Sequence, residues 1–231
     1  MRELSRDAIR LEHVRFRWPK AERLCLDVPA FSVSGGERVF IHGPSGSGKS
    51  TLLSLIAGVV DPEQGQVEVL GQALGEMQPR QRDRFRAANI GFIFQLFNLL
   101  PYLSALENIV LPCRFSAERA RRAASGVRED ALRLAGRLDL DPALLNRPAS
   151  ELSVGQQQRV AAARALIGSP GLIIADEPTS ALDADRQQGF LDLLLAETAR
   201  TGASLIFVSH DDRLAARFGR VVDLRTINQA R

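Results

Sequence analysis

Cysteine and long apolar runs are both scarce in this sequence of 231 residues. The two cysteines, Cys25 and Cys113, are far apart and match no spacing of a metal-binding cluster. They are therefore expected to be buried free thiols in a reducing, cytoplasmic compartment. The longest apolar candidate, Leu52 to Val60, is half as long as the roughly 18 residues that a membrane-spanning helix needs. The charged amino terminus has no apolar core of a secretion signal.

Lysine is scarce as well, and this gives weight to the few lysines that are present. Of the 30 basic residues, 28 are arginine, and only Lys20 and Lys49 are lysine. The net charge is only +3, so the pI near 9.4 reflects the arginine bias, and no nucleic-acid partner is expected. Where this chain needs a general positive charge it uses arginine. A lysine therefore indicates a need for a compact ammonium rather than a planar guanidinium.

Lys49 lies in the stretch GPSGSGKST, which matches the P-loop pattern G-x-x-x-x-G-K-[ST]. Such a loop turns several backbone N–H groups toward one point, where phosphate oxygens bind. A buried strand is predicted before it, over 38–41, and a helix after it, over 50–57. This arrangement aims the positive end of a helix at an anion, so a chance glycine-rich turn is the weaker interpretation. The predicted phosphate-binding residues are Gly43, Pro44, Ser45, Gly46, Ser47, Gly48, Lys49, Ser50 and Thr51.

The pattern of apolar residues predicts an α/β fold with an inserted helical segment. No strand pattern appears between about 96 and 170, where helices are expected over 116–138 and 157–167. Two prolines, Pro101 and Pro112, argue against one continuous helix over 96–112. We expect one domain over 1–231, with a mainly parallel core and an antiparallel β subdomain in 1–95 and 170–231, and a helical subdomain in about 96–169. The predicted strands cover 9–18 (with a slip near His13), 24–33, 66–70, 89–94, 172–175, 204–209 and 220–224.

Polar residues follow three of these predicted strands. Gln95 follows the strand predicted over 89–94, Asp176 and Glu177 follow the strand over 172–175, and His210 follows the strand over 204–209. Ligands of α/β sheets bind at the carboxyl ends of strands. There Asp176 would serve Mg²⁺, Glu177 would activate an attacking water, and His210 would contact a terminal phosphate. Each residue also has a plain structural explanation: a surface glutamine, a loop start or a structural histidine.

A second anion-binding device is predicted about a hundred residues after the P-loop. In Leu152 to Gln156 (LSVGQ), Ser153 is a good helix N-cap, and with Gly155 it would offer backbone donors at a helix N-terminus. One nucleotide does not need two such devices from one chain. Two chains arranged head to tail would use both.

In their order and spacing these motifs resemble the ATP-binding subunit of ABC transporters, and the resemblance covers nearly the whole chain. The Q-loop residue is Gln95, the signature is LSVGQ, the Walker B run is LIIADE, and the switch histidine is His210. Trp18 falls where the family has an aromatic residue that stacks on adenine. The D-loop corresponds to Ser180 to Asp183. The stretch GFIFQLFNLLPYLSALENIVLP looks most like the lipoprotein-release and macrolide-export branch.

The resemblance implies a P-loop ATPase that binds ATP and Mg²⁺ between two copies of itself. Trp18 would stack on adenine, while Ser153, Gly155 and Gln156 would come from the other copy. Ser50, Gln95 and Asp176 would serve Mg²⁺, with Glu177 as the base, and Lys49 and His210 at the phosphates.

The implied second partner is an integral membrane permease, which would hold the subunit at the inner face of the membrane. Its docking groove would include Phe97 and Tyr102, unless these residues pack inside the helical subdomain. An ATPase that acts on ribosomes or DNA is disfavoured, because tandem cassettes and long coiled-coil inserts are missing. An ATPase that regulates a cell-envelope partner without transport stays open.

The signature departs from the family pattern at Val154, where glycine is usual. A β-branched residue would be strained if the position required a positive φ, and tolerable if glycine only gave room at a helix start. We expect the second case, because the other motifs are intact.

Overall fold

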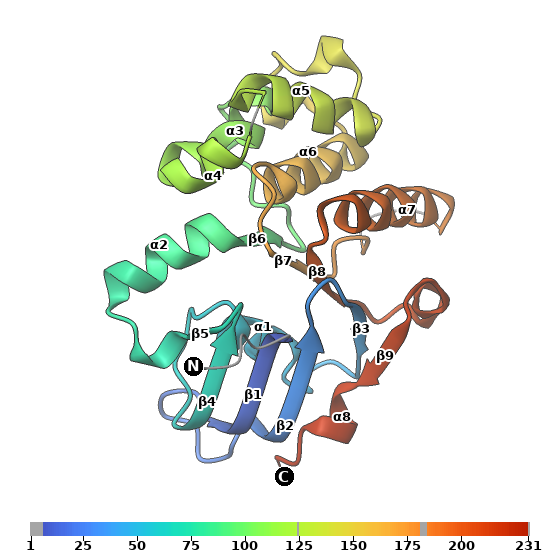
Figure 1. Cartoon of the computed structure of the whole chain (residues 1–231). Coiled ribbons are helices and arrows are strands. Elements are labelled where there is room, and N and C mark those ends of the chain that lie inside the picture. The colour runs from blue at the N-terminus through green and yellow to red at the C-terminus, as the bar shows by residue number, and fades with distance from the viewer. Residues whose placement is uncertain (1–6, 124, 181–183, 231) are drawn as a thin grey trace. The chain divides into compact units, whose positions relative to one another are not determined.

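The computed structural model describes residues 7–123, 125–180 and 184–230 (Figure 1). These residues form two compact units, Met1–Arg86 with Ser204–Arg231, and Ala87–Ala203. The division falls inside helix α2 (Pro79–Asn89). β6, β7 and α7 therefore group with the helical segment, whereas the sequence-based subdomains place them in the core.

The first unit contains an antiparallel sheet with the strand order β2-β1-β4-β5. In β1, alternate residues are buried, as the sequence pattern predicts, and the expected slip occurs at His13, where φ is 53° and the register with β4 shifts. Gly65 lies so close to this bulge that an added Cβ would be 2.3 Å from the His13 carbonyl oxygen. The strands are β1 (Asp7–Phe16), β2 (Leu26–Ser34), β4 (Gln64–Val69) and β5 (Gln72–Ala73).

The first unit also contains three parallel strands, with β3 (Arg38–His42) between β8 (Ser204–Val208) and β9 (Arg220–Asp223). Ile41 is opposite Val208 on one side and Val222 on the other, so the carboxyl ends of all three strands meet at one edge. The helical elements of this unit are α1 (Lys49–Ile56), α8 (Leu224–Ile227) and the 3₁₀ turns Leu74–Glu76 and Asp212–Arg217.

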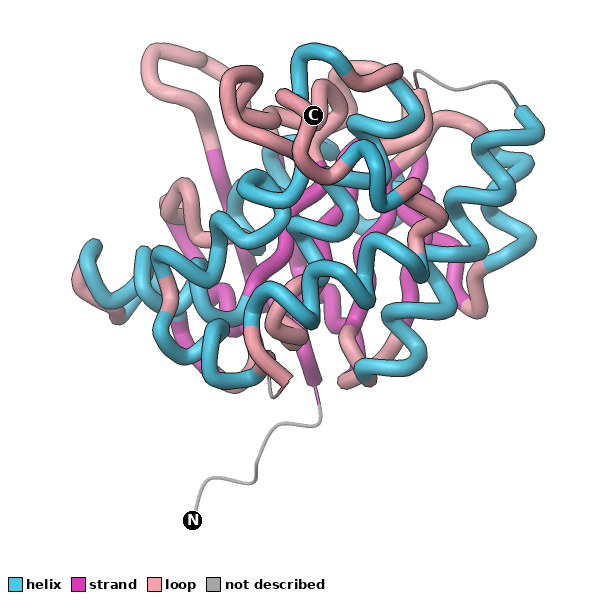
Figure 2. Tube along the Cα trace, turned by 90° about the horizontal axis from the view of Figure 1, so that it is seen from above, coloured by secondary structure: helices cyan, strands magenta, loops and turns pink. Residues whose placement is uncertain are grey.

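The second unit combines the parallel pair β6 (Ile90–Ile93) and β7 (Leu172–Asp176) with helices. Helix α6 packs against α3 and α5 (Figure 1), and Figure 2 shows all helices in cyan and all strands in magenta. The helical elements are α3 (Ala105–Phe115), α4 (Ala117–Arg122), α5 (Val127–Arg137), α6 (Val154–Leu166), α7 (Ala184–Thr201) and the 3₁₀ turns Pro142–Leu144 and Ala149–Glu151. The predicted α/β fold class is confirmed.

Two helix predictions need correction. The helix expected over 116–138 is two helices, because α4 ends at Arg122 and α5 begins only after Gly126, which takes a φ of 106° at its N-cap. The prediction that 96–112 is not one continuous helix is confirmed, because α3 begins only at Ala105, although Pro112 lies inside it. Helix α6 begins at Val154 rather than at 157, because Ser153 and Gln156 form a capping box ahead of it.

A buried arginine, Arg119, links several backbone segments of the second unit at the C-terminal end of α6. Arg119 is nearly inaccessible, and its guanidinium donates hydrogen bonds to backbone carbonyls, including those of Ile167 at 2.6 Å and Ile90 at 3.3 Å. Burial lowers the pKa of Arg119 to about 10, so it stays charged at neutral pH. The positive charge is balanced by carbonyl dipoles at the C-terminal end of α6.

Candidate functional site

The P-loop lies between strand β3 and helix α1, as the sequence predicts. Gly48 is the N-cap of α1, with a φ of 100° and no side-chain cap. An added Cβ there would be 2.8 Å from Leu26 Cδ2, so glycine is needed both for its φ and for the close approach of β2. The N-terminus of α1 therefore carries its uncapped backbone donors at the edge where the parallel strands end.

The interior of this loop contains polar groups that fit a phosphate ligand. The Lys49 ammonium is folded back on its own loop and donates to the carbonyls of Gly43 at 2.7 Å and Pro44 at 3.1 Å. The Ser47 hydroxyl oxygen is buried and has no hydrogen-bond partner among the described residues. Buried polar atoms are rarely left without a partner. These two groups indicate that the loop is shaped for an anion that would engage both of them.

Trp18 lies beside the first turn of α1. Its indole N–H donates to Thr51 Oγ1 at 3.2 Å, and its ring packs edge-on against Phe16 at 5.1 Å between centroids. These contacts fix the ring, while 44% of the residue stays exposed and is available for stacking.

Cys25 Sγ also contacts Thr51 Oγ1, at 3.3 Å, and the thiol is partly exposed rather than buried as expected. Cys113 is buried, and burial raises the pKa of its thiol.

His210 is exposed just beyond β8, at the edge of the sheet that carries the P-loop. The Ser209 N–H donates to the Ile41 carbonyl at 3.2 Å, so the last residues of β3 and β8 stay in register. The structure therefore brings Trp18, the P-loop and His210 together in the first unit.

Of the residues predicted to act on water and Mg²⁺, Gln95, Asp176 and Glu177 lie in the second unit, whereas Ser50 lies in the P-loop of the first unit. Ile93 pairs with Ala175, which places Gln95 beyond the end of β6 at the same edge as Asp176 and Glu177. Glu177 has a φ of 47°, an uncommon left-handed conformation for this residue type. The chain turns sharply there, and the Ser180 N–H donates back to the Glu177 carbonyl at 3.2 Å. Strain of this kind is often found at functional sites.

The signature motif begins helix α6 in the second unit. Ser153 Oγ accepts from the Gln156 N–H at 3.4 Å, and Gln156 Oε1 accepts from the Ser153 N–H at 2.9 Å. This capping box leaves the N–H groups of Val154 and Gly155 pointing out of the helix start. Val154 is the first helical residue and is not among the residues with positive φ. The expectation that this position does not require a positive φ, so that valine is tolerated there, is therefore confirmed.

The structure thus places the predicted site residues in two groups, one in each unit. It also shows a contact that the sequence reasoning missed: the buried Gln158 donates to the Pro178 carbonyl at 2.7 Å and ties α6 to the turn after Glu177. Helical spacing alone gives no signal for this bond. The D-loop prediction for Ala181, Leu182 and Asp183 lies outside the described residues.

The segment after Gln95 differs from the expected docking groove in one residue. Phe97 is only 6% exposed and has a φ of 59°. Arg164 of α6 donates to the backbone carbonyls of Phe97 and, at 2.7 Å, of Asn98. The prediction that Phe97 is a surface anchor is therefore wrong. Leu96 and Tyr102 are exposed, at 83% and 74%.

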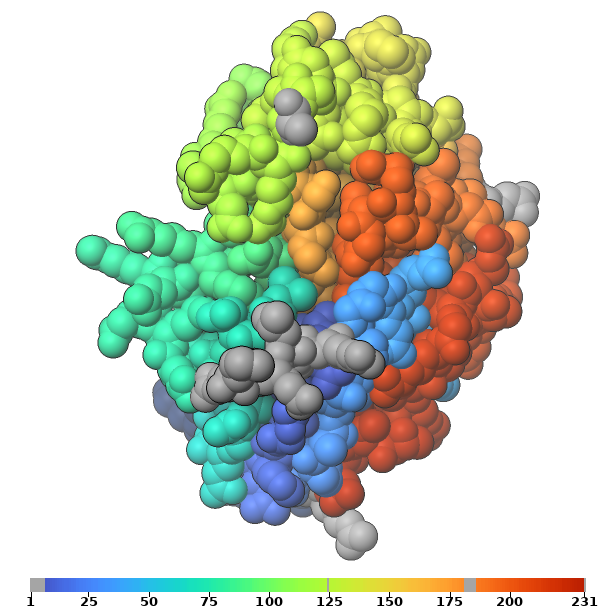
Figure 3. Space-filling model, viewed as in Figure 1, coloured from blue at the N-terminus to red at the C-terminus, as the bar shows by residue number. Residues whose placement is uncertain are grey.

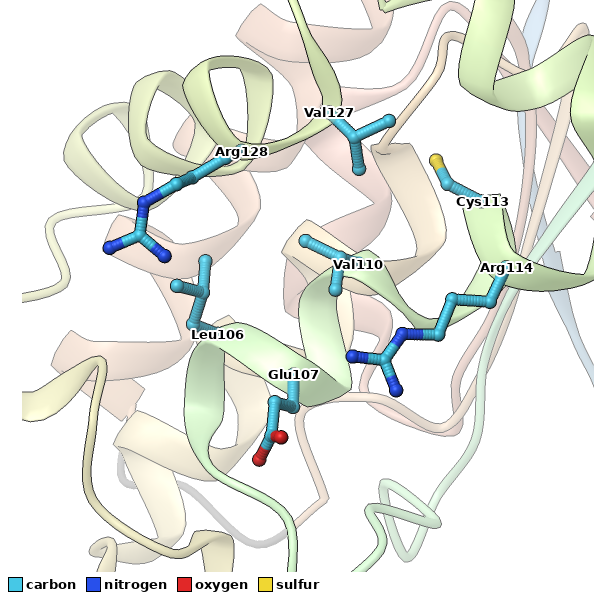
Figure 4. A pocket seen from close by; sticks show the side chains of 7 residues that line it. All are labelled: Leu106, Glu107, Val110, Cys113, Arg114, Val127 and Arg128. Carbon is cyan, nitrogen blue, oxygen red and sulfur yellow. The ribbon is translucent and has the colours of Figure 1, made fainter.

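A pocket of about 370 Å³ lies between α3 and α5 (Figure 4). Leu106, Val110 and Val127 face this space, and Arg114 and Arg128 lie at its rim. In Figure 3 these helices belong to the surface coloured green to yellow. The pocket contains none of the predicted nucleotide-binding residues.

A second pocket, of about 460 Å³ and in the first unit, borders the P-loop and is lined by Leu24, Cys25, Pro44, Ser45, Gly46, Ser47, Arg225, Asn228 and Ala230.

A phosphate loop between a parallel strand and a helix, in an α/β fold, defines a P-loop nucleotide-binding protein. Comparison with known proteins identifies the group more closely. A family model described as ABC transporter matches residues 26–180, and the chain belongs to this family, as an ATP-binding subunit.

Relatives with assigned names cover most of the chain. The uncharacterized ABC transporter ATP-binding protein YbbA of Escherichia coli K12 is 43% identical over 198 residues, 85% of this chain and 83% of YbbA. The lipoprotein-releasing system ATP-binding protein LolD of Pseudomonas fluorescens is 41% identical over 190 residues, 82% of each chain. The macrolide export ATP-binding/permease protein MacB of Burkholderia pseudomallei is 39% identical over 94% of this chain but only 32% of MacB. The resemblance to the lipoprotein-release and macrolide-export branch is confirmed.

The fold agrees with a solved structure. The dimeric ATP-binding cassette MJ0796, in a post-hydrolysis state bound to ADP and Pi, superposes with a TM-score of 0.83. It is 35% identical in sequence, and the match covers 93% of both chains. Among the described residues, no helix of this chain is long and apolar enough to cross a membrane.

The first testable prediction concerns Lys49. Replacing Lys49 with alanine removes the ammonium that the loop holds on Gly43 and Pro44, and nucleotide binding or turnover is expected to be lost without unfolding. Lys20→Ala, a change of the only other lysine, is the control and should leave both intact. The measurements are ATP affinity, ATPase rate and the melting temperature. Full ATPase activity in a folded Lys49→Ala variant would contradict the P-loop assignment.

Proposed function

We propose that the chain binds and hydrolyses ATP as a dimer and that this cycle drives a separate membrane permease in export or extraction. The observation that carries the proposal is the polar interior of the P-loop. Lys49 directs its ammonium onto backbone carbonyls, and the Ser47 hydroxyl is buried without a partner among the described residues. A triphosphate would engage both the Lys49 ammonium and the Ser47 hydroxyl, whereas no group of the loop itself contacts both.

The proposed nucleotide contacts follow from the two groups of residues. Trp18 stacks on the base, and the backbone donors of Gly43 to Thr51 surround the phosphates together with the Lys49 ammonium. Ser50, Gln95 and Asp176 are the residues that would hold Mg²⁺. That ion supplies charge neutralisation on the phosphates.

Glu177 is the proposed base for hydrolysis. It follows Asp176 directly, and its left-handed backbone turns it away from the line of β7. From there its carboxylate takes a proton from the water that attacks the terminal phosphate, and His210 contacts that phosphate. The other copy of the chain contributes Ser153, Gly155 and Gln156, as the dimeric state of the MJ0796 cassette supports.

The permease partner is supported by the names of the relatives. MacB is an ATP-binding/permease protein, and this chain matches only 32% of its length, so the match leaves room in MacB for a separate permease part. LolD is named as the ATP-binding protein of a lipoprotein-releasing system. We place the docking surface at Leu96 and Tyr102, because both large side chains are exposed in the segment that follows Gln95. This association would hold the chain at the inner face of the membrane.

The prediction for the base uses a change that preserves shape. Glu177→Gln keeps hydrogen bonding but removes the proton acceptor, so ATP binding should be retained while turnover falls by roughly 10²-fold or more. An ATP-bound dimer should accumulate, visible by size-exclusion chromatography with light scattering. Glu76→Gln, a change at an exposed glutamate of the first unit, is the control and should behave as the native chain. Near-native hydrolysis by Glu177→Gln would remove Glu177 from this role.

The prediction for docking uses the two exposed residues. The double variant Leu96→Ala with Tyr102→Ala should keep ATP binding but lose most of its association with membranes when expressed in its native cells. The measurement is the share of the chain recovered in the membrane fraction. Phe115→Ala, which removes another exposed aromatic side chain of the second unit, is the control. If the folded double variant stays with the membrane like the native chain, this surface is not the docking site.

A further inference from the structure

The chain after helix α8 returns to the P-loop through one side chain, Asn228. Its backbone N–H caps α8 by donating to the Leu224 carbonyl at 2.8 Å. The next residue, Gln229, donates its N–H to the Asp27 carbonyl at 2.7 Å, so the tail runs along the start of β2. All of these residues belong to the first unit.

The side-chain amide of Asn228 uses all of its hydrogen-bonding capacity on backbone groups. Its oxygen accepts from the N–H groups of Asp27 at 2.8 Å and Ala230 at 3.1 Å. Its nitrogen donates to the carbonyls of Cys25 at 3.1 Å and Ser47 at 3.2 Å. An amide has two donors and can accept two bonds, so both ends are satisfied. The acceptor end holds the tail and the start of β2, and the donor end holds the start of β2 and the P-loop.

The bond to Ser47 fixes the direction of a peptide group in the phosphate loop. The described chain contains no cis peptide bonds, so the carbonyl of Ser47 and the N–H of Gly48 point in opposite directions. Because the carbonyl is directed at Asn228, the Gly48 N–H is directed away from it. Gly48 is the N-cap of α1, where the P-loop pattern aims its backbone donors at phosphate.

The same amide also holds the place where β2 meets the loop. Gly48 approaches β2 so closely that a Cβ would contact Leu26 and the Cys25 carbonyl. Asn228 bonds the carbonyls on both sides of this contact, those of Cys25 and Ser47. Arg225, which lines the same pocket, does not take this role, because its guanidinium is paired with Asp223 and lowers the pKa of that carboxyl to about 2.

We propose that Asn228 is a positioning residue for nucleotide binding, which sets the orientation of the Ser47–Gly48 peptide so that the Gly48 N–H faces the phosphates. This inference rests on the proposed function of the P-loop. Asn228 itself touches no nucleotide and acts through the loop. No motif of the sequence marks it, since it lies in the last residues of the chain, far from the P-loop in sequence.

Two variants of Asn228 distinguish the role of the amide oxygen, which accepts, from that of the amide nitrogen, which donates. Asn228→Asp keeps the oxygen that accepts from Asp27 and Ala230 but replaces both donors with a charged oxygen against two carbonyls. Asn228→Ala removes both ends. The control is Gln229→Ala, which keeps the tail and its backbone bond to Asp27. ATP affinity, the KM for ATP, kcat and the melting temperature are measured for the native chain and for each variant under conditions where it is folded.

Both Asn228 variants should raise the dissociation constant and the KM for ATP by about tenfold, the size expected for weakening one charge-assisted hydrogen bond. The aspartate should have the larger effect, and kcat should change less than about twofold, because a backbone donor holds ground state and transition state alike. The control should match the native chain. A lower melting temperature with native affinity and KM would show that Asn228 only anchors the tail, and would overturn the proposal.

A measurement on the native chain covers the case in which both variants fail to fold. Backbone hydrogen exchange is followed with and without MgADP. If Asn228 couples the tail to the loop, residues 224–230 should gain protection together with the P-loop when MgADP binds. Protection of the P-loop alone would overturn the proposal. Absence of nucleotide binding by the native chain would instead overturn the proposed function and this inference with it, so the two failures are distinguishable.

Discussion

The ammonium of Lys49 is the group on which the account of this protein depends. A charged amine cannot be left without partners in a partly enclosed loop, so it is held by the carbonyls of Gly43 and Pro44. Those carbonyls are themselves backbone of the loop, and the bonds therefore keep the loop closed around its own cation. A phosphate group offers stronger, charge-assisted partners for the same amine. The loop is thus stable by itself and still suited to exchange these contacts for a ligand.

Parallel strand pairing places the remaining candidate residues. In the first unit, the register of β3 with β8 and β9 puts the P-loop and His210 at one edge. In the second unit, the register of β6 with β7 puts Gln95 at the same edge as Asp176 and Glu177. Each group is collected by backbone hydrogen bonds before any ligand is considered. The capping box at Ser153 does the same for the signature helix, because it fixes where α6 begins and which N–H groups remain outward.

Features that follow from local sequence were predictable, and those that depend on distant contacts were not. The P-loop, its strand and its helix follow from a pattern of neighbouring residues, and so do the polar residues that end strands. The sequence left open whether Phe97 is exposed or buried, and the bonds from the distant Arg164 to the Phe97 and Asn98 carbonyls have no signal in the local pattern. The break between Arg122 and Val127 was not predicted, because the helical pattern of apolar residues continues across it. Asn228 could not be found from sequence, since its four bonds join segments that no periodicity connects.

The presence of only two lysines allows a direct test of the central claim. Lysine side chains labelled with carbon-13 at Cε give two NMR signals, and the variant Lys20→Arg assigns them. When MgATP or MgADP is added, the Lys49 signal should shift in a saturable way as its ammonium moves from the Gly43 and Pro44 carbonyls to phosphate. The Lys20 signal should stay unchanged. Demonstrated nucleotide binding with no change in the Lys49 signal would contradict the account.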